Sequence, residues 1–144
     1  MKTLITMIAL MTTSALFARP STLHDEDLAI EMAESINYTS WEAIDAIENL
    51  RSSSSAPRVA KYRLGLLQED TLDLLDLLYE DAREAKIKQK FKALAKTYED
   101  VEASGYTLSR RHSDARDLKR AFRYLGSQFF ELCEAITPGS RICL

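Results

Sequence analysis

The side chains that could do catalytic or redox chemistry are few, and their spacing matches no established motif. The chain has 2 histidines, His24 and His112, and neither stands in a zinc, haem-attachment or metalloprotease motif. Met32 and His112 could ligate a haem, but each lies near the N-terminal end of its predicted helix, and those helices should run antiparallel. Ser109, His112 and Asp114 are neighbours at a predicted helix start, where a serine caps the helix. We therefore expect neither an enzyme nor a bound cofactor.

Four carboxylates form a stripe that could bind a hard cation. They are Glu69, Asp73, Asp76 and Glu80, and their spacing places them on one side of a helix. The stripe faces away from the leucine positions of the same helix, which is typical of a solvated surface. Carboxylate-bridged di-iron bundles also need Glu-x-x-His pairs, and no such tetrapeptide occurs in the chain. No metal site is expected.

The chain's 2 cysteines, Cys133 and Cys143, both lie near its C-terminal end. Turn-forming residues 137–140 lie between them and could fold the tail back onto the helix that carries Cys133. An even cysteine count favours a disulfide in an exported chain. A redox or metal-binding pair is disfavoured, because the spacing is not Cys-x-x-Cys and no histidine lies near. We predict a Cys133–Cys143 disulfide.

Charge is unevenly distributed along the sequence. The net charge of the whole chain is only −3, but residues 19–82 carry five bases against fourteen acids, and residues 83–144 carry thirteen bases against eight acids. Packing of one half against the other would neutralise much of this difference. A net acidic chain also lacks the overall field of a nucleic-acid binder, so no nucleic acid is expected as a partner.

Basic residues in the second half form the candidate interaction surface. These are Lys86, Lys88, Lys90, Lys92, Lys96, Arg116, Lys119, Arg120 and Arg123. The lysines surround apolar residues at helical spacing, a pattern of segments that lie on anionic surfaces. Two interpretations stay open: the surface binds an unknown protein or an anionic surface, or it only balances the acidic first half.

Residues 1–18 have the pattern of a secretory signal peptide. Lys2 precedes an apolar run over residues 4–11, and the small-residue segment after it ends at Ala18. The apolar run is shorter than the ~20 residues that a membrane span needs. We expect cleavage after Ala18 and a secreted domain over residues 19–144, periplasmic in a bacterium and extracellular in a eukaryote. Such a product is not an integral membrane protein.

Apolar residues recur at helical spacing throughout residues 19–144, and no segment there alternates with the period of a strand. The fold class is therefore all-α. We predict an up-down-up-down bundle with a disulfide-tied C-terminal tail. Its four helices are expected over residues 23–51, 57–81, 85–104 and 109–136. The alternative is one long kinked helix over 57–104.

Two local signals set the finer boundaries. Thr39 and Glu42 have the spacing of a capping box, which would kink or split the first helix near residue 38. Ser104 and Gly105 fit a helix C-terminus, so the third helix should end there.

The leading functional interpretation is an exported, non-enzymatic binding module that acts through charged helix faces. The alternative is a carrier that holds a small apolar ligand in the bundle core. That alternative depends on four aromatic residues, Trp41, Phe122, Phe129 and Phe130.

Overall fold

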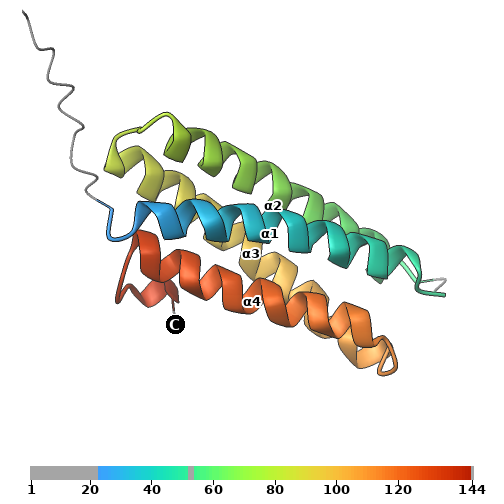
Figure 1. Cartoon of the computed structure of the whole chain (residues 1–144). Coiled ribbons are helices and arrows are strands. Elements are labelled where there is room, and N and C mark those ends of the chain that lie inside the picture. Colours follow the sequence, from blue (N-terminus) through green and yellow to red (C-terminus); the bar gives the residue numbers. More distant parts are fainter. Residues whose placement is uncertain (1–22, 52–53, 144) are drawn as a thin grey trace, which may run out of the picture.

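Four long helices and one short 3-10 helix make up the described chain (Figure 1). The computed structural model describes residues 23–51 and 54–143, so the predicted signal peptide at residues 1–18 lies outside them. The elements are α1 (Glu26–Glu48), α2 (Ala56–Tyr79), α3 (Glu84–Arg111), α4 (Arg116–Ile136) and η1 (Arg141–Cys143). They form the expected all-α, up-down-up-down bundle, which confirms the predicted fold class.

Each helix packs against its two neighbours around the bundle. α1 packs against α2 and α4, and α3 packs extensively against α2 and less extensively against α4. The Asp25 N–H donates to the Ala135 carbonyl at 3.2 Å, so the start of α1 is held to the end of α4. We call this the tail end of the bundle, and it also holds the 80–83 connection. The opposite end, with the end of α1, the start of α2 and the connection 112–115, we call the groove end.

Local sequence signals account for the starts of α1 and α2. The Leu28 N–H donates to the Asp25 carboxylate at 3.0 Å, and Glu26 and Asp27 follow in the first turn. Negative side chains there interact favourably with the positive end of the helix dipole. Pro57 lies in the first turn of α2, where backbone N–H groups have no carbonyl partner within the helix. The lack of an N–H in proline therefore costs no hydrogen bond there.

The predicted apolar seams form the core. The largest fully buried side chains come from all four helices: Phe91, Ile36, Ile47, Leu64, Leu67, Leu74, Leu78, Leu94, Leu108, Leu118, Leu125 and Leu132. Phe129 stacks between two rings of α3, with centroids 5.7 Å from Phe91 and 4.0 Å from Tyr98. None of the helices that the structure describes has the length and apolar content needed to cross a bilayer.

The 80–83 connection excludes the alternative of one long helix over 57–104. α2 ends at Tyr79 and α3 begins at Glu84, so the chain reverses between them. Asp81 adopts a positive φ of 50°, a conformation that aspartate tolerates better than most residues. Residues 80–83, which include no large apolar side chain, therefore form the turn between α2 and α3.

The predicted end of the third helix at Gly105 was wrong. α3 continues to Arg111, and Gly105 is buried inside it. A Cβ atom added at Gly105 would lie 2.3 Å from the Phe122 ring of α4. This glycine therefore permits close approach of two helices and does not terminate one.

The structure excludes the alternative of a first helix split near residue 38, in agreement with the single helix expected over residues 23–51. α1 runs without interruption from Glu26 to Glu48, and Thr39 and Ser40 are buried within it. The Ser40 hydroxyl donates to the Ile36 carbonyl at 2.7 Å, one turn earlier. This bond satisfies the hydroxyl inside the helix, so the capping-box spacing has no structural consequence here.

Candidate functional site

The structure places the predicted basic residues in two groups. The five lysines, Lys86, Lys88, Lys90, Lys92 and Lys96, lie on the first half of α3, toward the tail end. The second group lies on the first two turns of α4, at the groove end: Arg116, Lys119, Arg120 and Arg123. Because α3 and α4 run antiparallel, the two groups are displaced along the bundle and do not form one continuous stripe.

Lys90 has a structural role. Its Nζ atom lies 2.9 Å from Asp70 Oδ1 and 2.7 Å from Asp73 Oδ2, both on α2. The Thr97 hydroxyl donates to the other oxygen of Asp70 at 2.6 Å. Partial burial lowers the pKa of Lys90, but hydrogen bonds and charge attraction from Asp73 and Asp70 outweigh it and raise that pKa above its usual value. The ammonium group therefore joins α3 to α2.

The other lysines of α3 are more accessible. Lys88 forms an ion pair with Glu84 one turn earlier on the same helix. Lys86, Lys92 and Lys96 are exposed, and within residues 23–51 and 54–143 no carboxylate forms an ion pair with them. Among these five lysines, Lys90 is therefore the one that pairs with carboxylates of the acidic half.

The basic group on α4 is only partly occupied by internal contacts. The Lys119 ammonium donates to the Ser113 carbonyl at 2.6 Å, and Arg120 forms an ion pair with Asp117. Arg116 and Arg123 are exposed and form no ion pair with any residue in the described part of the chain. Two guanidinium groups are therefore available to a partner.

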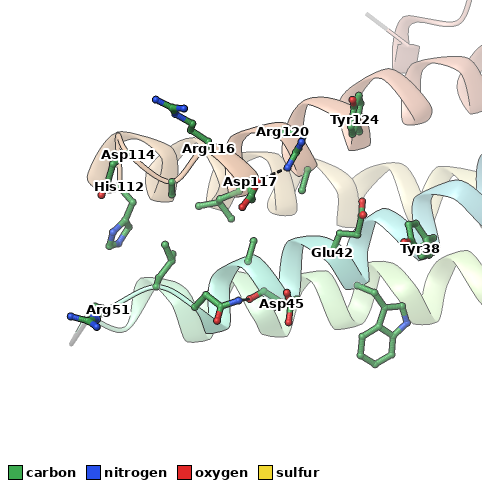
Figure 2. Close-up of a pocket in the computed structure, with 17 residues that line it drawn as sticks. Tyr38, Glu42, Asp45, Arg51, His112, Asp114, Arg116, Asp117, Arg120 and Tyr124 are labelled. Carbon is green, nitrogen blue, oxygen red and sulfur yellow. Dashed lines mark hydrogen bonds and ion pairs between the residues drawn. The ribbon is translucent and has the colours of Figure 1, made fainter.

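A groove of about 1250 Å³ lies between the second half of α1 and the first half of α4 (Figure 2). Figure 2 shows Tyr38, Glu42 and Asp45 along α1, with α4 side chains opposite, and Arg51 and His112 at one end. The α4 side contributes four labelled residues: Arg116, Asp117, Arg120 and Tyr124. The groove thus combines aromatic rings with charges of both signs.

Three aromatic side chains that line this groove are largely exposed. Tyr38 is 66% exposed, Trp41 is 61% exposed and Tyr124 is 51% exposed. The sequence interpretation had treated Trp41 as a core aromatic. The apolar seam of α1 instead passes through Ile36, Ala43 and Ile47, and Trp41 is out of phase with it. That phase is the signal in the sequence that could have placed Trp41 on the surface.

The carrier hypothesis loses part of its basis. Trp41 and Phe130, two of its four aromatic residues, are exposed at 61% and 52%. Phe129 is buried by packing on α3, and Phe122 is packed against Gly105. These two rings fill contacts between helices and do not line an internal ligand cavity.

The structure also places the acidic stripe of α2 and the residues considered as haem ligands. Glu69, Asp73, Asp76 and Glu80 are all exposed on α2. Among the described residues, no group of three or more potential metal ligands lies close enough to hold an ion. Met32 is buried in the core near the start of α1, and His112 lies at the other end of the bundle.

The predicted disulfide is confirmed. Cys133 and Cys143 are bonded, with their Cα atoms 5.6 Å apart. The bond ties η1 to the last turn of α4 and so folds the tail back onto the bundle. It lies at the tail end, away from the groove.

The chain matches no protein-family model, no curated protein sequence and no solved structure in the comparisons made with it. Its function is therefore inferred from its own residues, and the groove end offers the strongest basis.

Proposed function

We propose that this chain is an exported, non-enzymatic binding protein that engages a macromolecular partner at the groove between α1 and α4. One observation carries the proposal. The groove of about 1250 Å³ between α1 and α4 is lined by three exposed aromatic residues, Tyr38, Trp41 and Tyr124, next to exposed arginines of α4. Exposed aromatic side chains that gather in one groove, rimmed by polar residues, are typical of an interaction site.

The composition of the groove supports binding to a macromolecule. Tryptophan, tyrosine and arginine are the residue types that contribute most to the affinity of protein interfaces. The carboxylates Glu42 and Asp45 on α1 face the basic residues of α4, so the groove can select a partner by charge as well as by shape (Figure 2).

Export is proposed from the pattern of residues 1–18, and the disulfide is compatible with it. Disulfides form and persist in secreted and periplasmic compartments and are rare in the reducing cytosol. The Cys133–Cys143 bond would be stable in either oxidising location.

Native mass spectrometry of the protein purified from its source tests the class of ligand. A co-purifying polypeptide would support the binding function. A retained small apolar molecule, without a polypeptide, would support the carrier and contradict the proposal.

Site-specific photocrosslinking tests the location. The variant Trp41→p-benzoylphenylalanine places a crosslinker in the groove, and Tyr62→p-benzoylphenylalanine is a matched control on α2, where Tyr62 is 68% exposed. We expect a discrete crosslinked species in the source organism with the variant at position 41 and none with the variant at position 62. Equal crosslinking at both positions would show that the groove is not the binding site.

A further inference from the structure

The segment from Arg110 to Arg123 is strongly basic and rich in arginine. Six of its side chains are basic and two are acidic, a net charge of +4 with His112 neutral, whereas the whole chain has a net charge of −3. We call the surface formed by these basic residues and the neighbouring tyrosines the arginine face. Its members are Arg110, Arg111, Arg116, Lys119, Arg120, Arg123, Tyr106 and Tyr124.

Three shallow depressions make the arginine face continuous across α3 and α4. One of about 360 Å³ lies among Tyr106, Arg110 and Arg111 on α3. A second of about 390 Å³ lies between the helices and is bordered by both Tyr106 and Arg123. A third of about 290 Å³ lies on α4 and is bordered by Arg123 and Tyr124. Because neighbouring depressions share Tyr106 and Arg123, one elongated ligand could contact all three.

Two close packing contacts join α3 and α4, the helices that carry the arginine face. Gly105 lets the Phe122 ring approach the backbone of α3 closely, and Tyr98 stacks on Phe129 with the ring centroids 4.0 Å apart. A fixed spacing between charged groups reduces the ordering cost when a partner binds.

Most guanidinium groups on this face are free to bind an anion. Arg110 lies over the Tyr106 ring at 5.7 Å from its centroid, an arrangement that leaves the edge of the guanidinium group accessible. Arg111, Arg116 and Arg123 are exposed and have no ion-pair partner in the part of the chain that the structure describes. Only Arg120 is paired with a carboxylate, that of Asp117.

Starting from the proposed binding function, we infer that the arginine face recognises an acidic segment of a partner polypeptide. Five of its six basic residues are arginines, whose planar guanidinium groups bind carboxylates through two parallel hydrogen bonds. Exposed tyrosines between the arginines supply apolar contact area of the kind found in protein interfaces.

Two other anionic partners fit this face less well. A helix that lies on a membrane needs large apolar side chains that enter the lipid, but Leu118 is buried here and Phe122 is packed against α3. A nucleic acid is disfavoured because the whole chain has a net charge of −3 and lacks the overall field of a nucleic-acid binder.

Binding of a fluorescein-labelled hexaglutamate peptide to the full chain tests the inference by fluorescence anisotropy. The double variant Arg116→Glu and Arg123→Glu should weaken binding about tenfold or more, because two attractive contacts become repulsive. The matched control is Lys86→Glu with Lys92→Glu, which makes the same change in charge at the tail end. Along α3, Lys92 lies about 27 Å from Arg110, far beyond the ~8 Å screening length at physiological salt, so we expect less than a twofold effect.

Each other outcome contradicts the inference. Equal weakening by the two double variants would show that only net charge matters. Tighter binding of hexadeoxythymidylate or of phosphatidylserine vesicles than of hexaglutamate would assign the face to a nucleic acid or a membrane. If the Glu variants fail to give a helical circular-dichroism spectrum, Arg116→Gln with Arg123→Gln replaces them, and unchanged binding by that variant would overturn the inference. Specific crosslinking at position 41 without hexaglutamate binding would leave the proposed function standing and remove only this inference.

Discussion

Gly105 and Gly65 are both interior glycines of helices, but only Gly105 faces a neighbouring helix. A Cβ atom at Gly105 would overlap the Phe122 ring, whereas nothing lies within 4 Å of a Cβ atom at Gly65. Gly105→Ala should therefore destabilise the fold by about 1–3 kcal/mol, because the ring must move out of its packed position. Gly65→Ala should stabilise it by up to about 1 kcal/mol, because alanine favours helix.

Urea unfolding followed by circular dichroism measures both changes. The two substitutions are chemically identical and differ only in their surroundings, so each is the control for the other. Stabilisation by Gly105→Ala would show that α3 and α4 are not in close contact at this point.

Tyr98 gives the bundle a pH-dependent contribution to stability. Burial, with a smaller effect from the negative charge of Glu102, raises the pKa of Tyr98 to about 12. In the unfolded chain the phenol ionises near pH 10, so between pH 10 and about 12 the unfolded form loses a proton that the folded form keeps. The contribution of Tyr98 is complete below pH 10 and is lost as the pH rises through this window.

Tyrosinate absorbance measures this ionisation directly. The titration of the wild-type protein minus that of Tyr98→Phe should have its midpoint near pH 12 while circular dichroism shows that the protein is folded. A difference titration centred near pH 10 would show that the Tyr98 phenol is solvated.

At the scale of helices, hydrophobic periodicity predicted the four elements and their order because each helix has a single continuous apolar seam. The error at Gly105 and the open alternative at Thr39 arose where a residue has two possible roles. Gly105 can end a helix or permit close packing, and the choice depends on Phe122, which is distant in the sequence. Thr39 can cap a helix or be buried within one, and the choice depends on the apolar phase of α1.

The disulfide stabilises the tail more than the bundle. Its loop encloses only the end of α4, a turn and η1, whereas α1 is held to α4 by the Asp25–Ala135 hydrogen bond outside that loop. Cys143→Ser should increase hydrogen exchange over residues 137–143, with a loss of global stability no larger than about 3 kcal/mol.

Two controls accompany the Cys143→Ser measurement. Ile142→Ser changes the same tail but leaves the Cys133–Cys143 bond intact, and Ile142 is 40% exposed. This variant should leave hydrogen exchange in α4 unchanged. The denatured, unreduced wild-type protein should contain no reactive thiol. Faster exchange throughout all four helices of Cys143→Ser would show that the bond supports the whole bundle.

At the scale of the whole molecule, the opposite charges of the two halves are matched by a few specific contacts. Lys90 binds two carboxylates of α2, and Arg63 approaches Asp100 at 4.0 Å, so both contacts join the two halves. The Lys61–Glu48 pair, at 2.5 Å, lies within the acidic half. The sequence predicted the overall attraction but could not identify these pairs, because pairing depends on how each helix is rotated toward its neighbour.

Lys90 and Lys92 distinguish specific pairing from a general attraction between the halves. They lie two residues apart on α3, about 200° around the helix, and only Lys90 faces the carboxylates of α2. Lys90→Glu should lower the free energy of unfolding by about 1–2 kcal/mol at low ionic strength, because it replaces two attractive contacts with repulsion. Lys92→Glu makes the same change in net charge and should alter stability by less than about 0.5 kcal/mol.

Salt and a compensating substitution make the lysine experiment decisive. Added salt should recover only part of the loss in Lys90→Glu, because the Lys90 side chain is 22% exposed and partly shielded from solvent ions. Asp70→Lys combined with Lys90→Glu should recover stability relative to Lys90→Glu alone, because the pair is restored with its charges exchanged. If Lys90→Glu and Lys92→Glu were equally destabilising in urea unfolding, the acidic and basic halves would interact through their overall field, and the exposed lysines of α3 would then be structural as well.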